Sequence, residues 1–254
     1  MDRWAGKIAV VTGASVGIGA AIAVALANAG VNVVGLARRP QLIEQLKDKV
    51  TGSGQIYSRA CDIGKPEEIA SSFAFIHSTY GGIDILINNA ALIFHGDITD
   101  FSPAALSDSE IEDTVDVNLR GAILCARHAV CSMKKNNFSG HVVNINSIAG
   151  HYVPFQSILN IYPSTKYGIT AFSAALLAEL AQYGQRIRVT SISPGIVETQ
   201  MSEVSRLPDL TDMAKALPKL RPSDIADAVI YAISAPSTVN ISEIIIQPVG
   251  EKRI

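Results

Sequence analysis

The chain has 254 residues, which is enough for one large α/β domain or two small ones and for a sizeable buried core. Hydrophobic residues make up 48% and charged residues 17%, and this composition excludes an intrinsically disordered chain. The formal net charge of −2 provides no basic field, so nucleic acid is not expected as a partner.

Segments with a strand pattern and segments with a helix pattern alternate along the whole chain. Short apolar runs predict strands, and alanine-rich or amphipathic runs that begin at proline or end at glycine predict helices. The first half predicts strands at Ile8–Thr12, Asn32–Ala37, Gln55–Ala60 and Ile83–Ile87, and helices at Gly17–Ala29, from Pro40 to about Val50, and at Pro66–Tyr80.

The second half opens with a long helical stretch from about Ser107 to Lys135, with Ser107 and Glu110 as a candidate capping box. Residues 198–219 carry no strand pattern, and Pro208 and Pro218 space them, so we interpret them as a mobile helical flap. The other predicted elements are strands at His141–Asn146, Arg188–Ile192 and Ile241–Ile246, and helices at Tyr162–Tyr183 and Ser223–Ser234.

This alternation predicts an α/β fold in which helices cover both faces of a parallel sheet. The sheet is expected to be open and doubly wound, of the Rossmann type, with the ligand crevice at the carboxyl ends of its strands. No linker, repeat or low-complexity run divides the chain. We therefore expect residues 1–254 to form a single domain.

A stretch without charged residues runs from Lys7 to Arg38 and resembles a membrane span in its hydropathy. Its period changes from continuously apolar to glycine-rich to alternating, which favours a buried strand, a turn, a buried helix and a second strand. The first residues show no signal-peptide core. The cysteines Cys61, Cys125 and Cys131 match no zinc or redox spacing, and Cys125 and Cys131 are expected to be buried hydrophobes of a helix. A soluble cytoplasmic protein is expected.

A glycine-rich turn, Thr12–Gly19, follows the first predicted strand and opens the first helix. Glycines in such a turn let phosphate oxygens approach the backbone N–H groups of a helix N-terminus. The spacing Gly-x-x-x-Gly-x-Gly differs from the commoner dinucleotide fingerprint, and an ordinary strand–helix turn is the alternative. The residues predicted to contact the phosphates are Gly13, Ser15, Gly17, Ile18 and Gly19.

The end of the second predicted strand indicates which cofactor binds. An acidic residue there would hold the ribose 2′-hydroxyl of NAD, whereas this chain has Arg38 and Arg39, whose guanidinium groups suit a 2′-phosphate. The sequence thus predicts NADP(H), and the alternative is a pair of solvated arginines. Asp62 and Ile63 follow the third strand, where the adenine is expected; the alternative for Asp62 is a carboxylate at a helix start.

Tyr162 and Lys166 are four residues apart and share one face of a predicted helix, near its start because Pro163 is tolerated only in a first turn. A free tyrosine has a pKa of about 10, and a neighbouring ammonium group lowers that pKa toward the neutral range. The pair is therefore a candidate proton shuttle, although a short motif of this kind also recurs by chance.

Two further polar residues are candidates for the same site. Ser147 follows the fifth predicted strand, where its hydroxyl would hold a substrate oxygen, and capping a turn is its alternative role. Asn118 falls within the long helix, where asparagine is mildly unfavourable, which suggests a polar task. The alternative for Asn118 is an exposed helix position.

These residues together resemble the short-chain dehydrogenase/reductase superfamily from Lys7 to about Val249. The resemblance rests on Thr12-Gly-x-x-x-Gly-x-Gly, Asn88-Asn89-Ala90, Asn118, Ser147, Tyr162-x-x-x-Lys166, and Pro194-Gly195 with Val197 and Thr199. It implies about seven parallel strands between helices, and a homodimer or homotetramer.

The resemblance also implies roles for individual residues. Tyr162 would be the acid/base, Ser147 would hold the substrate oxygen, and Lys166 would bind the nicotinamide ribose and lower the pKa of Tyr162. Asn118 would distort its helix and hold a water in a proton relay. The resemblance places Asn89 and Ala90 on the adenosine side of the cofactor, and it places Pro194, Gly195, Val197 and Thr199 at its nicotinamide end.

The sequence departs from the family pattern at two places, of which the second borders the expected substrate pocket. Ala91 stands where the family has glycine, and the interval from Ser147 to Tyr162 is about two residues longer than usual. With Asp2-Arg3-Trp4, Ser193-Pro194-Gly195 and this longer loop, the chain resembles insect farnesol-dehydrogenase-like proteins and their vertebrate carbonyl and hydroxysteroid reductase relatives. The apolar residues that flank the site favour an uncharged, hydrophobic substrate and include Phe94, Tyr152, Val153, Phe155, Ile158, Leu159, Met201, Val204, Leu207, Leu210 and Met213.

The resemblance therefore implies an NADP(H)-dependent oxidoreductase that interconverts a hydrophobic alcohol, such as a terpenoid alcohol, and its aldehyde or ketone. A hydroxysteroid or ecdysteroid ketone reductase is the first alternative, and an NADP-binding protein without turnover is the second. The five histidines have no metal-ligand spacing, so no metal is expected.

Overall fold

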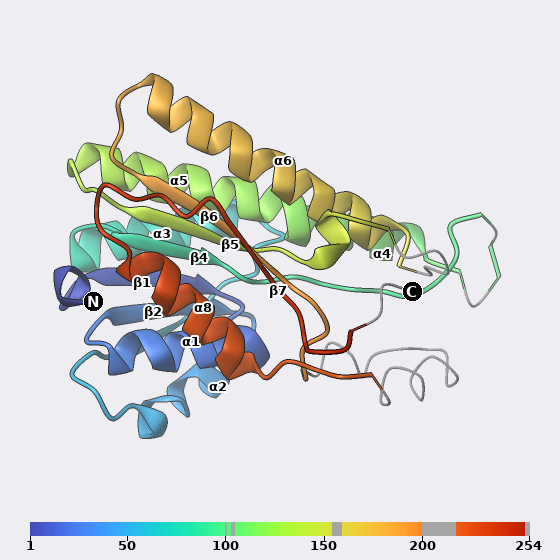
Figure 1. Ribbon diagram of the computed structural model, residues 1–254, viewed down its shortest axis with the longest axis horizontal. Coiled ribbons are helices and arrows are strands. Elements are labelled where there is room, and N and C mark those ends of the chain that lie inside the picture. Colours follow the sequence, from blue (N-terminus) through green and yellow to red (C-terminus); the bar gives the residue numbers. More distant parts are fainter. Residues whose placement is uncertain (100, 103–104, 154–158, 200–216, 252–254) are drawn as a thin grey trace.

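Seven parallel strands form one sheet in the order β3-β2-β1-β4-β5-β6-β7 (Figure 1). The computed structural model describes residues 1–99, 101–102, 105–153, 159–199 and 217–251, so most of the predicted flap lies outside the described residues. The strands are β1 (Ile8–Thr12), β2 (Asn32–Ala37), β3 (Ile56–Ala60), β4 (Ile85–Asn88), β5 (His141–Ile145), β6 (Arg188–Pro194) and β7 (Glu243–Ile246). This is the single α/β domain with a doubly wound sheet that the sequence predicts.

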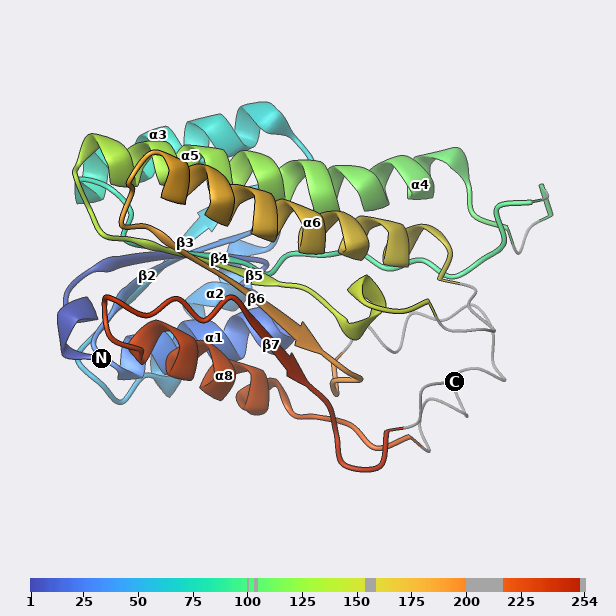
Figure 2. The ribbon, with the colours of Figure 1, turned by 45° about the horizontal axis from the view of Figure 1, so that its top comes forward.

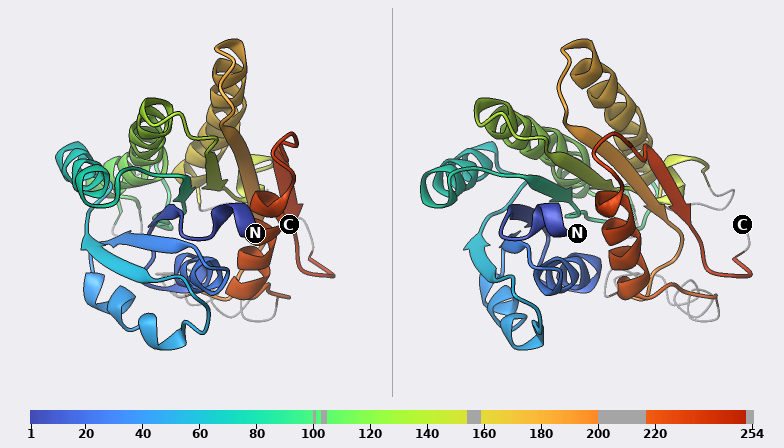
Figure 3. Two further views of the ribbon diagram at one scale, coloured as in Figure 1. Left: turned by 90° about the vertical axis from the view of Figure 1, so that its left-hand side faces the viewer. Right: turned by 60° about the vertical axis from the view of Figure 1, so that its left-hand side comes forward.

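Helices cover both faces of the sheet (Figures 2 and 3). Alternate residues of β1 point to opposite sides: Ala9 and Val11 pack in one apolar cluster with α1 and α8, and Ile8 and Val10 pack in the other with α3 and α5. The helices are α1 (Gly17–Asn28), α2 (Pro40–Glu44), α3 (Pro66–Tyr80), α4 (Asp108–Val115), α5 (Ala122–Lys135), α6 (Ile161–Gln182) and α8 (Pro222–Ser234).

The uncharged stretch after Lys7 folds as β1, a turn, α1 and β2, as the change of period predicts. Among the described residues, no helix is both long and apolar enough to cross a membrane. The predicted helix from Pro40 is shorter than expected, because α2 ends at Glu44 and a separate 3₁₀ turn covers Lys47–Lys49. The capping box of Ser107 and Glu110 is confirmed at the start of α4.

The long helical stretch after Ser107 is interrupted. Residues Asp116–Gly121 form a π-helical segment between α4 and α5. Cys125, on α5, is buried as predicted, but the expectation for Cys131 is wrong, because that side chain is exposed. Six residues on a helix correspond to about 240° beyond a full turn, so the two cysteines cannot share a buried face.

The strand order reverses direction at β1 and β4. The chain winds from β1 outward to β3, returns to β4 and then continues to β7 on the other side of β1. Open α/β sheets bind ligands in the crevice at the carboxyl ends of the strands at such a switch point. The turn after Thr12 and the loop after Asn88 meet there.

At the opposite end of the sheet, three side chains cap the C-terminus of α8. Arg188 donates from Nη2 to the carbonyl of Ile233 at 3.2 Å and from Nη1 to that of Ala235 at 3.1 Å. Arg3 donates to the same two carbonyls, and Trp4 Nε1 donates to Ile233 at 2.9 Å. Cationic donors suit this end of a helix, since its last carbonyls carry partial negative charge.

We expect Arg188→Met to lower the free energy of unfolding by about 2–3 kcal/mol, the range for a hydrogen-bonded charged group. The loss follows because Arg188 is buried and its hydrogen bonds to the carbonyls of Ile233, Ala235 and Val239 are removed. Urea unfolding followed by the fluorescence of Trp4, the one tryptophan, measures it. Arg3→Met, at an exposed position, is the control and should cost less; equal losses would contradict this explanation.

Candidate active site

The turn between β1 and α1 forms one wall of a cleft at the switch point. Gly13 and Gly17 adopt positive φ angles of 66° and 57°, which L-residues with side chains rarely take. The N–H groups in the first turn of a helix have no intrahelical acceptor. In α1 no side chain caps them. A helix N-terminus in this state is suited to an anion such as a phosphate.

The predicted Gly19 does not line the cleft but packs behind the turn. A Cβ atom on Gly19 would lie 2.3 Å from the carbonyl oxygen of Gly13 and 2.4 Å from Nδ2 of Asn89. Glycine is therefore required here for close packing of the helix on the loop, rather than for contact with a ligand.

Thr12 and Asn89 join the two loops of the switch point. The Thr12 hydroxyl accepts the N–H groups of Asn89 at 3.0 Å and Ala90 at 3.1 Å. Asn89 Nδ2 in turn donates to the carbonyls of Thr12 at 2.9 Å and Gly13 at 3.2 Å. Both loops are thus fixed before any ligand arrives, and Ala90 lines the cleft beside Asn89.

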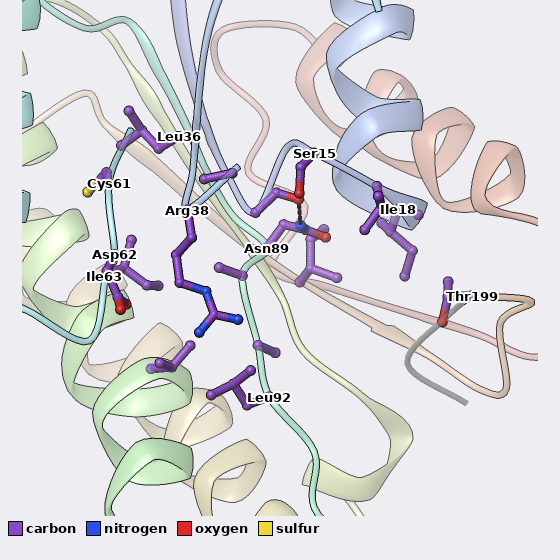
Figure 4. A pocket seen from close by; sticks show the side chains of 18 of the residues that line it. Ser15, Ile18, Leu36, Arg38, Cys61, Asp62, Ile63, Asn89, Leu92 and Thr199 are labelled. Atoms are coloured by element: carbon purple, nitrogen blue, oxygen red, sulfur yellow. Dashed lines mark hydrogen bonds between the residues drawn. The ribbon is translucent and has the colours of Figure 1, made fainter. Parts of the chain in front are cut away.

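The second strand ends at the other side of the cleft. Arg38 and Arg39 line it and are exposed, and the Arg38 side chain points into it (Figure 4). Within the described part of the chain, no carboxylate forms an ion pair with Arg38. Asp62 and Ile63 also line the cleft, and Oδ1 of Asp62 accepts the N–H of Gly64 at 3.0 Å. Asp62 therefore has the turn-capping contact of its alternative role and lies at the predicted site as well.

Tyr162 and Lys166 lie in the first two turns of α6 and line the cleft from inside. Both side chains are buried, with relative exposures of 8% and 4%. Nζ of Lys166 donates to the carbonyl of Ile145, at the end of β5, at 3.0 Å, and it lies 5.5 Å from the centre of the Tyr162 ring. The predicted pair is therefore brought together on one helix face.

Burial shifts the pKa of Tyr162 and the pKa of Lys166 away from their ordinary values. It raises the pKa of Tyr162 to about 12, although a hydrogen bond with the Ser147 side chain opposes the rise. Burial also lowers the pKa of Lys166 to about 8. The sequence predicts instead that Lys166 lowers the pKa of Tyr162. In this structure desolvation by burial has the largest effect on the pKa of Tyr162. The Lys166 ammonium group is directed at the Ile145 carbonyl.

Ser147 begins the 3₁₀ turn Ile148–Gly150 directly after β5. Its hydroxyl accepts the N–H of Ala149 at 3.1 Å and also hydrogen bonds the side chain of Tyr162. Ser147 therefore caps a turn and approaches the tyrosine at the same time. The two roles considered for it do not exclude each other.

Asn118 lies in the π-helical segment and is 2% exposed, so the alternative of an exposed helix position is wrong. Its Oδ1 accepts the N–H of Leu92 at 2.7 Å, and its Nδ2 donates to the Leu92 carbonyl at 2.8 Å and to the hydroxyl of Thr165 at 3.3 Å. The hydroxyl of Thr165 donates to the Tyr162 carbonyl at 2.8 Å. Asn118 thus links the loop after β4 to the helix that carries Tyr162.

The cleft contains most of the predicted site residues but not all of them. Thr199 lines it, whereas Asn118, Ser147, Gly19, Pro194, Gly195 and Val197 lie around it without forming its wall. Further lining residues, which no motif indicates, lie at or after the ends of strands or beside predicted positions. These are Val16, Leu36, Ala37, Cys61, Ala91, Leu92, Val117, Ile145 and Asn146.

Ala91 takes its place without backbone strain. Among the described residues, the positive φ angles outside glycine occur at Asn137 and Asn160. Ala91 therefore has an ordinary backbone conformation that accepts a methyl group. The departure from the family pattern at this position does not distort the loop.

The described histidines do not gather around a metal. No group of three or more metal-ligating side chains occurs among the described residues. His151 lies away from the cleft wall, with Nε2 at 2.9 Å from Ser193 Oγ and 3.0 Å from Glu243 Oε1. His141 is buried and hydrogen bonds Thr190 at 2.8 Å.

Comparison with known proteins identifies the family. A family model described as short chain dehydrogenase matches residues 7–209. The chain belongs to the short-chain dehydrogenase family. It is therefore an oxidoreductase of that family, and the resemblance stated from the sequence is confirmed.

Several curated members of the short-chain dehydrogenase family match almost the whole chain. A farnesol dehydrogenase of Aedes aegypti is 42% identical over 99% of this chain and 100% of that protein. The human dehydrogenase/reductase SDR family member 11 is 40% identical over 98% of this chain and 96% of that protein.

Solved structures of the short-chain dehydrogenase family share this fold. A metagenomic short-chain oxidoreductase in complex with NADP has a TM-score of 0.79 at 28% identity, and 98% of this chain and 99% of that chain are covered. The closed form of a serine dehydrogenase with NADP⁺ has a TM-score of 0.85 at 29% identity, and 97% and 96% are covered.

Proposed function

We propose that this protein is an NADP(H)-dependent oxidoreductase that interconverts a hydrophobic alcohol and its aldehyde or ketone, with Tyr162 as the acid/base. The observation that carries the proposal is the buried Tyr162, which is hydrogen-bonded to Ser147, together with the buried Lys166 on the same helix face. Tyr162 and Lys166 line a cleft that also contains Arg38 and the glycine turn.

The cleft suits a nicotinamide dinucleotide. The uncapped N-terminus of α1 provides N–H donors for a diphosphate, and Gly13 and Gly17 line the cleft beside it with positive φ angles. Arg38 and Arg39 are available for a 2′-phosphate, and no acidic residue takes their place at the end of β2. Asp62 and Ile63 would lie beside the adenine, and Asn89 and Ala90 beside its ribose.

At the other end, Lys166 would hold the nicotinamide ribose, and Pro194, Gly195, Val197 and Thr199 would support the nicotinamide. The bound cofactor supplies or accepts the hydride. Ser147 orients the substrate oxygen against the Tyr162 hydroxyl, and Tyr162 exchanges the proton with that oxygen. Asn118 fixes the loop and helix on either side of this pair, and we assign it the proton-relay water as well.

The protonation state of Tyr162 decides whether the site is ready for carbonyl reduction or for alcohol oxidation. With its pKa raised to about 12 by burial, Tyr162 is a phenol at neutral pH and is ready to donate a proton to a carbonyl oxygen. Oxidation of an alcohol requires the phenolate instead. The hydrogen bond with the Ser147 side chain stabilises that form.

We favour a terpenoid alcohol such as farnesol as the substrate, supported by the 42% identical farnesol dehydrogenase. The apolar residues Phe94, Tyr152 and Val153, which flank the site in sequence, agree with an uncharged substrate. The flap side chains from Met201 to Met213, and Phe155 and Ile158, lie outside the described residues. A hydroxysteroid or ecdysteroid ketone is the alternative substrate. A panel of farnesol, retinoids, steroids and ecdysteroids with both cofactors tests this choice.

The remaining proposals concern the protein as a whole. We propose one cofactor-binding domain over residues 1–254 with a substrate flap at about 198–219, a homodimer or homotetramer, and a cytoplasmic location. A cofactor-binding protein without turnover is the competing function. Oxidation or reduction of the nicotinamide by any alcohol or carbonyl compound of the panel, followed by absorbance, would exclude it.

We expect Arg38→Ala to weaken NADPH binding about tenfold and to leave NADH binding within about twofold, because only NADPH carries the 2′-phosphate that a guanidinium binds. Fluorescence titration of the reduced cofactors measures both dissociation constants. Arg59→Ala, which removes an arginine of β3 that contacts α3, is the control. Equal weakening of NADPH and NADH by Arg38→Ala would contradict the NADP preference.

A further inference from the structure

Glu251, which follows β7, hydrogen bonds the backbone of the segment Gly195–Thr199 and lies outside the cleft wall. Oε1 of Glu251 accepts the N–H of Ile196 at 3.0 Å, and Oε2 accepts from Nε2 of Gln247 at 2.8 Å. We propose that Glu251 is a positioning residue that sets the affinity of the cleft for the nicotinamide half of the cofactor. This inference rests on the proposed function, and it concerns a residue outside the cleft wall.

Three backbone donors attach this segment to the rest of the domain. The N–H of Gly195 donates to the carbonyl of Ile246 in β7 at 2.8 Å, and the N–H of Glu198 donates to that of Leu220 at 2.8 Å. Both of these bonds join backbone to backbone. The N–H of Ile196, which lies between them, takes the side chain of Glu251. The carbonyl of Ile196 also accepts the N–H of Leu220 at 2.8 Å. A single substitution of Glu251 therefore releases the side-chain attachment and leaves these backbone bonds in place.

The carboxylate fits closely against the backbone. A Cβ atom on Gly195 would lie 2.3 Å from Oε2 of Glu251 and 2.7 Å from Oε1. Any side chain at this position would displace the carboxylate, so Gly195 is required for the approach of Glu251. This contact gives a physical reason for glycine in the Pro194-Gly195 motif that does not involve the ligand directly.

The charge of Glu251 makes the attachment strong. Hydrogen bonds to a carboxylate are shorter and stronger than those between neutral groups. No lysine or arginine of the described ranges forms an ion pair with Glu251, and its carboxylate accepts hydrogen bonds from the Ile196 N–H and the Gln247 amide. The carboxylate therefore acts as a charged hydrogen-bond acceptor for the backbone of this segment.

The same segment ends at the cleft. Thr199 lines the cleft, and its Cγ2 methyl lies against the glycine turn, where a Cβ on Gly17 would be 3.3 Å away. Thr199 and Arg38 lie at opposite sides of the close view (Figure 4). An attachment that orders Gly195–Thr199 should therefore affect binding of the part of the ligand that is remote from Arg38. NADP and NAD have that part in common.

This placement predicts a signature that distinguishes Glu251 from Arg38. Loss of the attachment leaves the segment to be ordered when the ligand binds, and that cost lowers affinity. We expect Glu251→Ala to weaken NADPH and NADH about tenfold each, since both carry the nicotinamide. Binding of 2′,5′-ADP, which carries the adenosine and the 2′-phosphate without nicotinamide, should stay within about twofold.

Fluorescence and calorimetric titrations of the full chain with NADPH, NADH and 2′,5′-ADP test the proposal. Glu251→Gln keeps an amide oxygen that accepts the Ile196 N–H and should restore most of the affinity. Glu179→Ala, which removes an exposed carboxylate from α6, is the matched control and should bind all three ligands as the parent chain does.

Two results would overturn the role of Glu251: unchanged NADPH affinity in Glu251→Ala, or equal weakening of 2′,5′-ADP, which would indicate a general loss of structure. Failure of the parent chain to bind any of the three ligands would overturn the proposed function itself. Binding by the parent chain, together with an unaffected Glu251→Ala variant, refutes this inference alone.

Discussion

Tyr162→Phe is expected to lower kcat about a thousandfold or more, which lies within the range for loss of a general acid/base. The phenylalanine ring refills the buried space, so the loss reflects the missing hydroxyl and not a cavity. NADPH affinity should change by less than about threefold, because Lys166, the glycine turn and Arg38 remain. Initial rates with the best alcohol or carbonyl substrate, and a fluorescence titration with NADPH, measure the two quantities.

Tyr167→Phe provides the matched control for this experiment. Tyr167 lies one turn further along α6 and is 43% exposed, so it lies outside the cleft wall. The control should keep the rate of the parent chain. A Tyr162→Phe variant that retained more than about a tenth of that rate would refute the proposed acid/base, whatever the substrate.

The sequence predicts the architecture well because its signals are local. Strand and helix alternation, glycine at α1 and proline at the starts of α2, α3 and α8 each depend on neighbouring residues alone. Right-handed crossovers then determine which face of the sheet each connecting helix covers, whereas the strand order is found only in the structure. The expectation of a buried Cys131 is wrong, since helix membership does not by itself tell which face a residue occupies.

The site is less predictable from the sequence, because its properties depend on contacts between distant segments. Asn118 is recognisable as unusual, but its π-helical segment and its bonds to Leu92 appear only once the loop after β4 lies beside it. Similarly, Glu251 is 55 residues from Ile196, and no motif connects them. The pKa of Tyr162 depends on burial, which the spacing of Tyr162 and Lys166 does not give.

Lys166→Met is expected to remove a pH dependence from the stability of the cofactor-free protein. Burial lowers the pKa of Lys166 to about 8 in the folded chain, whereas the pKa of an unfolded lysine is about 10.4. Between these values the unfolded chain binds the proton and the folded chain does not, so the free energy of unfolding rises with pH. The full rise is about 3 kcal/mol, at 1.36 kcal/mol for each pKa unit.

Tyr162 has the opposite effect at higher pH. Its folded pKa of about 12 exceeds the unfolded value of about 10, so the folded chain binds the extra proton above pH 10 and loses stability as the pH rises. The range from pH 7 to pH 10 therefore isolates Lys166. Urea unfolding at several pH values in this range should give a parent chain that gains about 2–3 kcal/mol relative to Lys166→Met.

The comparison between variants cancels groups that titrate alike in both proteins. Lys49→Met removes an exposed lysine and should follow the parent chain at every pH. The difference in free energy of unfolding between the parent chain and Lys166→Met could instead stay constant with pH. That result would mean that burial does not hold Lys166 in its neutral form above pH 8. The expected result would instead show that the fold is destabilised below pH 8 by a buried ammonium group. That cost would be the stability given up to keep a positive charge beside Tyr162.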